Sequence, residues 1–238
     1  MKHYLPALLL LAAWAVPAGA AQFTITPVRI FMTTKDRAVA VTVTNDSDEE
    51  VVMQADLYAW KQRPDGSDDL QLTEDLILTP PILKLAPRAR QVVRLARLSP
   101  PPGDAQQTYR LVMREVPEAR ASNQLQLQVA LAFSLPVFIT PPGVKRELQC
   151  GLERAAPDLV RAVCSNGGNA YAQIRALEVF DARGTKVAAR DAGGYLLPSV
   201  RRSFELPAAG GRIPAGKVKL QVALDDGSLQ AFDATLNE

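Results

Sequence analysis

The segment that most constrains the fold covers residues 124–141. Between 124 and 135, large apolar side chains alternate with polar or small ones at Leu125, Leu127, Val129, Leu131, Phe133 and Leu135. Strict period-two alternation of this length predicts a β-strand with one apolar and one polar face. The strand is long, since strands usually have about five or six residues. It is either an ordinary sandwich strand or a strand whose edge pairs with another chain.

Further alternating segments lie on both sides of it, and the 18 prolines, which are spread along the chain, argue against long helices. In the first half we expect strands at 23–32, 39–43, 51–60, 70–78, 82–85, 91–98 and 108–116. In the second half we expect them at 147–153, 159–165, 170–181, 186–190, 202–206, 217–224 and 229–236. Pro27 interrupts the first of these strands, which predicts an edge strand or a strand that changes sheets. This pattern predicts an all-β protein with two tandem immunoglobulin-like β-sandwich domains.

The clearest boundary is Thr140-Pro141-Pro142-Gly143, a stiff and extended joint. We therefore expect an N-terminal immunoglobulin-like domain at 21–140 and a C-terminal one at 141–238, joined by a short proline-containing hinge. Residues 1–20 have the form of a secretory signal peptide: a positive start, an apolar core and an Ala18-Gly19-Ala20 exit. Cleavage after Ala20 and cleavage after Ala21 both fit.

Removal of this signal restricts the chemistry of the mature protein. His3 is the only histidine of the chain, so histidine-based catalysis and histidine-bearing zinc sites are excluded. The loss of Lys2 leaves 26 basic residues against 25 acidic ones, a net charge near +1. This balance gives no reason to expect nucleic acid as a partner. We expect no catalytic residues, no metal, no cofactor and no membrane insertion.

The chain has two cysteines, Cys150 and Cys164. In an exported protein they are expected to form a disulfide, and closing a loop of about 15 residues is worth on the order of 3 kcal/mol. Two free thiols are the alternative. Because the chain has no Cys-x-x-Cys pattern, the cysteines do not indicate a redox enzyme.

Three short motifs resemble one family. Thr26-Pro27-Val28-Arg29-Ile30, the segment 79–87 with its Thr-Pro-Pro start, and Arg114-Glu115-Val116-Pro117 occur in order before the alternating strand. Together they resemble the periplasmic pilus chaperones of the chaperone–usher pathway, often called PapD-like. The resemblance covers the whole chain after the signal. It implies a boomerang arrangement of the two sandwiches and a location in the periplasm.

The resemblance also implies a function, donor-strand complementation. In this family the chaperone lends a strand to a pilus (fimbrial) subunit that lacks one, and then delivers the subunit to an outer-membrane usher. The side chains expected to form the donated ladder here are Leu125, Leu127, Val129, Leu131 and Phe133. An exposed apolar ladder also predicts self-capping or a homodimer of the free protein.

A cleft arginine and a lysine bind the C-terminal carboxylate of the subunit in this family. Arg29 matches the arginine, and a guanidinium suits bidentate binding of a carboxylate. The lysine position corresponds to Pro136, whereas Lys145 and Arg146 lie too far along the chain. We therefore expect the second positive charge from a neighbouring strand, with Arg94, Arg97 and Arg114 as candidates. The sequence 134–138, Ser-Leu-Pro-Val-Phe, resembles the archaic branch of the family.

Three other interpretations are open. A pilus subunit or adhesin would carry an N-terminal donor extension and an incomplete sandwich, whereas both halves here have full strand sets. A secreted two-domain module that binds sugars or peptides also fits the fold. Paired tryptophans would favour sugar binding, but one of the two, Trp14, lies in the signal. An enzyme would have to depend on carboxylate pairs such as Asp68-Asp69, which have the character of solvated charge.

Overall fold

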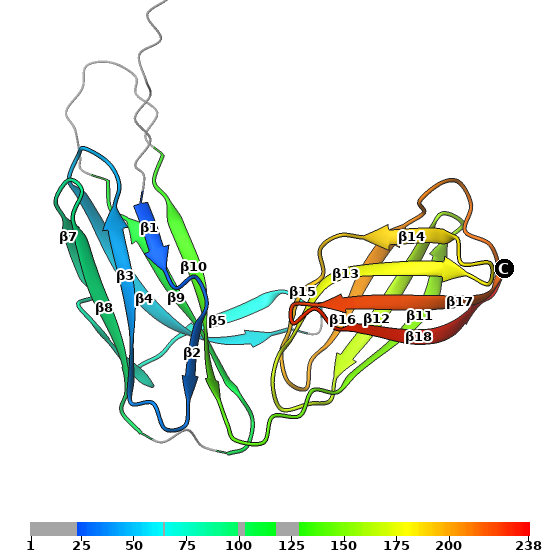
Figure 1. Cartoon of the computed structure of the whole chain (residues 1–238), viewed down its shortest axis with the longest axis horizontal. Coiled ribbons are helices and arrows are strands. Elements are labelled where there is room, and N and C mark those ends of the chain that lie inside the picture. Colours follow the sequence, from blue (N-terminus) through cyan, green and yellow to red (C-terminus); the bar gives the residue numbers. More distant parts are fainter. Residues whose placement is uncertain (1–22, 64, 100–102, 118–128) are drawn as a thin grey trace, which may run out of the picture.

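The computed structural model of the 238-residue chain describes residues 23–63, 65–99, 103–117 and 129–238. Throughout these residues the regular elements are β-strands, which form two sandwiches (Figure 1). This confirms the predicted fold class. The expected signal segment, 1–20, lies outside the described residues. In the part of the chain described, no helix has the length and hydrophobicity needed to cross a membrane.

Two sheets form the first sandwich. Sheet A has the strand order β1-β3-β8-β6, and sheet B has the order β2-β10-β9-β4-β5, with β7 also paired to β4. The strands are Phe23–Thr26 (β1), Ile30–Thr33 (β2), Ala38–Asn45 (β3), Val51–Gln62 (β4), Asp68–Leu72 (β5), Leu76–Thr79 (β6), Ile82–Leu85 (β7), Arg90–Arg97 (β8), Gln107–Glu115 (β9) and Ala132–Thr140 (β10). Paired strands are antiparallel except for β2 and β10, which are parallel.

Alternation along the strands places the core of the first sandwich. Met53 on β4, Leu111 and Met113 on β9, and Val137 on β10 are all fully buried between the two sheets. Successive side chains of a strand point to opposite faces, so the intervening residues lie on the outer face of sheet B. That outer face carries Trp60 of β4, Arg110 of β9 and Phe138 of β10.

The chain changes sheets at Pro27, and β1 and β2 are also edge strands of their sheets, so both predicted alternatives apply here. Thr26 ends β1, which pairs with β3 in sheet A, and Ile30 begins β2, which pairs with β10 in sheet B. Ile25 and Ile30 are both buried, so the core continues across the crossover.

Two predicted strands differ from the structure. The expected strand at 70–78 is two strands, because β5 pairs with β4 in sheet B and β6 pairs with β8 in sheet A. The expected strand at 124–141 corresponds to β10, which begins at Ala132 and ends at Thr140, and residues 129–131 are not in a strand. Its antiparallel partner β9 ends at Glu115, whose amide donates to the Leu131 carbonyl at 2.8 Å, and the described pairing of the two segments ends there. Residues 118–128 lie outside the described residues.

The second sandwich also has two sheets. Sheet C has the order β11-β12-β16, and sheet D has the order β14-β13-β17-β18, with β15 paired to β13. The strands are Leu148–Ala156 (β11), Leu159–Asn166 (β12), Ala172–Asp181 (β13), Lys186–Arg190 (β14), Gly194–Leu196 (β15), Arg201–Pro207 (β16), Gly216–Leu224 (β17) and Leu229–Leu236 (β18). The short β15 was not predicted. Cys150 and Cys164 face each other on β11 and β12 and form the predicted disulfide.

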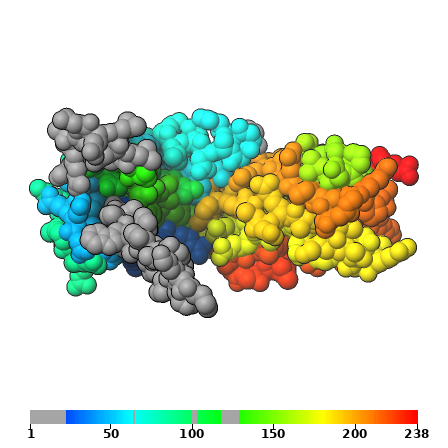
Figure 2. Space-filling model, turned by 90° about the horizontal axis from the view of Figure 1, so that it is seen from above, coloured from blue at the N-terminus to red at the C-terminus, as the bar shows by residue number. Residues whose placement is uncertain are grey.

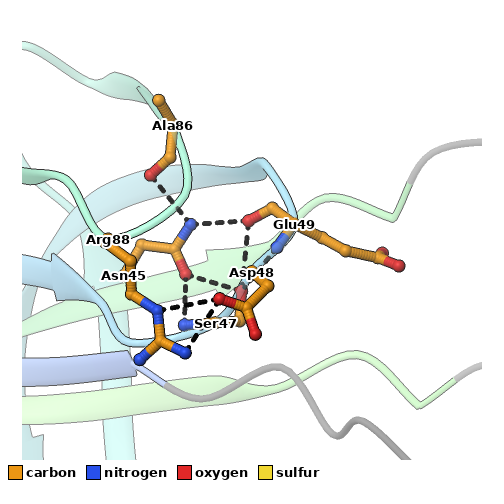
Figure 3. A network of polar contacts seen from close by, with 6 residues as sticks. All are labelled: Asn45, Ser47, Asp48, Glu49, Ala86 and Arg88. Atoms are coloured by element: carbon orange, nitrogen blue, oxygen red, sulfur yellow. Dashed lines mark hydrogen bonds and ion pairs between the residues drawn. The ribbon is translucent and has the colours of Figure 1, made fainter.

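A buried asparagine fixes the end of a strand in each sandwich. Asn45, at the end of β3, is fully buried, and its amide nitrogen donates to the carbonyls of Glu49 at 2.7 Å and Ala86 at 3.1 Å (Figure 3). The same nitrogen lies 3.1 Å from the Leu85 carbonyl. Asn166, at the end of β12, binds two carbonyls in the same way. These bonds satisfy loop carbonyls that would otherwise be buried without partners.

Candidate functional site

The first feature of the site is an open edge on β10. On one side β10 pairs with β9 from Ala132 to Ile139, but on the other side it pairs with β2 only from Val137 to Thr140. Among the described strands, none pairs with the second edge of β10 between Ala132 and Pro136. Its backbone groups there are available to a strand from another chain. The open edge follows in sequence directly after the alternating residues 125–131, which are predicted to form the donor strand.

The predicted ladder is described only in part. Leu125 and Leu127 lie outside the described residues. Val129 is 69% exposed, Leu131 is half-buried, and neither is in a strand. Phe133 has the same parity but packs against the first core, with its ring centroid 4.7 Å from that of Phe23. The role of these five side chains stays a prediction.

Arg29 lies in the turn between β1 and β2, and its side chain reaches the second sandwich. Nη1 donates hydrogen bonds to Asp225 Oδ2 at 2.8 Å and to Gln173 Oε1 at 3.0 Å. The Arg29 side chain is 37% exposed and that of Asp225 is 13% exposed. Burial lowers the pKa of Arg29, but the bond to Asp225 and the neighbouring Tyr195 and Tyr171 raise it, and the net pKa lies above its ordinary value. Arg29 is therefore a permanent cation at the junction of the two sandwiches.

The structure does not bring the other predicted cations to this junction. Arg94 is exposed on the outer face of sheet A, in register with Ala40 of β3. Arg114 lies on the outer face of sheet B, where it donates to Asp56 Oδ2 and to the Tyr58 hydroxyl. Arg97 donates to backbone carbonyls of the β2–β3 connection. The assignment of Arg94 or Arg114 to the carboxylate site thus has no support from their positions.

A different arginine lies opposite the position of the missing lysine. Arg110 on β9 is the register partner of Pro136 on β10. Its guanidinium carbon lies 3.7 Å from the centre of the Trp60 ring, and Nη2 lies 3.5 Å from Asp68 Oδ2. The side chain is only 13% exposed, and this burial lowers the pKa of Arg110. The alternation of β9 places Arg110 on the outer face, but only strand register reveals that it faces Pro136.

An aromatic cluster joins the outer face of sheet B to the second sandwich. The closest pair is Phe138 of β10 and Tyr171, which stack with centroids 4.1 Å apart. Trp60 of β4 contacts Tyr195 of β15 edge to face at 5.3 Å. Leu197 completes the buried part of the cluster. Sequence reasoning missed this cluster because no local pattern indicates that a second domain covers an outward-facing strand position.

Glutamine side chains add hydrogen bonds across the same junction. Gln62, at the end of β4, donates to the Tyr195 carbonyl and accepts from the Leu197 amide, both at 3.0 Å. Gln106 accepts from the Tyr171 amide at 2.9 Å. Each of these bonds links one sandwich to the other. Directional hydrogen bonds therefore hold the angle between the two sandwiches, together with the packing of the rings.

The β4–β5 hairpin extends to the second sandwich beside these contacts. In Figure 2 the part of the chain that contains this hairpin, coloured cyan, lies directly against the second sandwich. Gly66 in its turn has φ +83°, and a Cβ there would lie 2.4 Å from Nε of Arg202. A larger residue at Gly66 would therefore be strained and would displace this arginine.

Comparisons with known proteins agree with this architecture. The family model described as "Pili and flagellar-assembly chaperone, PapD N-terminal domain" matches residues 22–145, a range that contains Arg29, Arg110 and β10. An uncharacterized fimbrial chaperone, YbgP of Escherichia coli strain K12, is 29% identical over 124 residues, 50% of this chain and 49% of the relative. The chain thus matches about half the length of that relative.

Solved structures share the fold of both sandwiches. The CsuC–CsuE chaperone–tip adhesion subunit pre-assembly complex, from archaic chaperone–usher Csu pili of Acinetobacter baumannii, has a TM-score of 0.67 and 21% identity, covering 92% of this chain and 100% of that chain. The complex of the SafB chaperone with SafA pilin of Salmonella enterica has a TM-score of 0.60 and 15% identity, covering 92% and 98%. The chaperone DraB of Escherichia coli has a TM-score of 0.58 and 22% identity, covering 91% and 97%.

The matched family consists of chaperones and not of enzymes, which agrees with the prediction of a non-enzymatic protein. Because the family model covers just over half of the chain, the assignment is direct: the chain belongs to the pili and flagellar-assembly chaperones with a PapD N-terminal domain.

Proposed function

We propose that this protein is a periplasmic chaperone that holds pilus subunits by donor-strand complementation and delivers them to an outer-membrane usher. The observation that carries the proposal is the open edge of β10 between Ala132 and Pro136, which continues into the alternating segment. Family membership and the shared fold with chaperones solved in complex with pilus subunits support it.

A strand of a subunit would pair with this edge through backbone hydrogen bonds, while alternate side chains of 125–131 fill its groove. Each fully buried aliphatic side chain contributes about 1.5–3 kcal/mol. Leu125, Leu127, Val129 and Leu131 together therefore provide on the order of 6–12 kcal/mol. This is of the same size as the cost of association, about 4–15 kcal/mol, so backbone pairing and an anchor for the chain end are both needed.

Arg29 would supply that anchor by binding the C-terminal carboxylate of the subunit. The guanidinium already donates to Asp225 through Nη1, and its side chain remains 37% exposed. A guanidinium has five N–H donors, so Arg29 can bind a second carboxylate while Asp225 holds it in position. Arg110, which lies opposite Pro136 on the outer face of sheet B, would supply a second positive charge.

Co-purification of a co-expressed subunit tests the proposal. Leu127→Asp should strongly reduce the amount of subunit recovered, because it puts a charge into the apolar ladder. The matched control Gln126→Asp, on the other face of the strand, should have a much smaller effect. Equal losses from the two variants would contradict donation of one face.

The anchor has its own test in the same assay. Arg29→Glu should abolish recovery of the subunit while the chaperone stays folded, as judged by circular dichroism. Arg29→Gln, which removes the charge without introducing a like charge beside Asp225, should also reduce recovery. Wild-type recovery with both variants would show that Arg29 is not the anchor.

A further inference from the structure

A cluster of three nearly parallel aromatic rings at the junction includes one exposed ring. Phe31 on β2 is the register partner of Phe138 on β10, and their ring centroids lie 5.6 Å apart at an interplanar angle of 23°. Phe138 in turn stacks on Tyr171 at 4.1 Å and 22°. Phe138 is fully buried and Tyr171 is 6% exposed, whereas Phe31 is 51% exposed. The Phe31 centroid also lies 6.5 Å from that of Tyr171, so Phe31 contacts both rings, and about half of its surface is open to a further partner.

The exposed ring and the proposed anchor belong to one connected group of side chains. The Tyr171 hydroxyl donates to Asp225 Oδ2 at 3.4 Å, and the same oxygen accepts from Arg29 Nη1 at 2.8 Å. Arg29 and Phe31 are also two residues apart, which places their Cα atoms at most about 7 Å from each other. A cation and an exposed aromatic surface thus lie within the span of a single bound residue.

We propose that Phe31 recognises the last side chain of the bound subunit, with a preference for an aromatic residue at the chain end. This inference rests on the proposed function, because it places the terminal carboxylate on Arg29. In a terminal residue the carboxylate and the side chain both branch from one Cα, so a carboxylate on Arg29 brings the side chain to Phe31. A planar ring would pack on the exposed surface of Phe31 at the spacing that aromatic pairs prefer, about 4.5–7 Å.

Short carboxylate probes test this without a whole subunit. Binding of N-acetylglycyl-phenylalanine, N-acetylglycyl-alanine and N-acetylglycyl-phenylalaninamide to the protein lacking residues 1–20 is measured by amide chemical-shift titration. The wild type should bind the phenylalanine acid about two- to tenfold more tightly than the alanine acid, the range expected for one aromatic pair. The amide should bind more weakly than either acid.

Variants separate the ring from the anchor. Phe31→Ala should remove the preference for phenylalanine and leave the affinity for the alanine acid unchanged. The control Ile77→Ala, an exposed apolar residue on sheet A, should retain the preference. Phe31 is half-exposed, so its truncation leaves the core intact, which circular dichroism verifies.

Three results would overturn the inference: equal affinity of the wild type for the two acids, a preference that persists in Phe31→Ala, or no binding of the phenylalanine acid. None of these three results would by itself contradict donor-strand complementation. The donor strand would still be supported if subunit capture remained sensitive to Leu127→Asp and not to Gln126→Asp.

Discussion

Replacement of Phe138 by alanine should uncouple the two sandwiches. Phe138 lies on β10 and is fully buried, with four ring neighbours: Tyr171 at 4.1 Å, Phe31 at 5.6 Å, Tyr195 at 5.7 Å and Trp60 at 6.0 Å. Two of these rings belong to each sandwich, so the side chain fills the junction rather than either core. A truncation here removes contacts that hold the sandwiches together.

The expected cost is large for a single substitution. Truncation of a buried phenylalanine to alanine usually costs about 3–5 kcal/mol of unfolding free energy. Because the cavity lies at a junction that can partly close, we expect the lower part of that range, about 3–4 kcal/mol. Phe138→Leu retains most of the apolar volume and loses only ring stacking and shape, so it should cost about 1–2 kcal/mol.

Urea unfolding of the protein lacking residues 1–20 measures these costs. The chain has two tryptophans, and Trp14 is within the removed segment, so Trp60 fluorescence then reports the junction alone. Circular dichroism reports the strands of both sandwiches. In Phe138→Ala the fluorescence transition should move to lower urea than the dichroism transition. A loss below about 1 kcal/mol with coincident transitions would refute the junction as a structural element.

Two further predictions concern the same junction. Gln62→Ala should lower the unfolding free energy by about 1–3 kcal/mol in the same urea assay, because it leaves the Leu197 amide without its acceptor and removes the closer of two donors to the Tyr195 carbonyl. An unchanged midpoint would contradict this. Burial, and then the negative charge of Asp225, raise the pKa of Tyr171 from 10.0 to about 12. The stabilisation by the protonated phenol should be complete below pH 10 and lost as the pH rises from 10 towards 12, and Tyr171→Phe should lack this loss.

The sequence was sufficient for the fold class but not for the contacts between distant residues. Alternation identified most strands, and Pro27 predicted the change of sheet between β1 and β2. Alternation could not show that residues 70–78 form two strands. Their leucines keep one parity, at Leu70, Leu72, Leu76 and Leu78, while the chain moves from sheet B to sheet A. Periodicity defines the face of a strand but does not define its neighbour.

The same limit applies to the site. Arg29 was identified through its motif, and its position at the junction is compatible with the anchor role. Arg110 was missed because its pairing with Pro136 depends on the register of β9 and β10. Phe138 and Trp60 lie on strand positions that face outwards from the first core, and only the second sandwich makes them buried. The disulfide was predictable because the two cysteines are the only ones in the chain and are close in sequence.

Donation of the segment leading into β10 can be followed by hydrogen exchange of backbone amides, measured for the free chaperone and for its complex with a subunit. Amides between 124 and 135 should exchange much more slowly in the complex, while those of β18 in the second sandwich should be unchanged. A stable complex in which amides 124–135 exchange as fast as in the free protein would show that this segment is not donated.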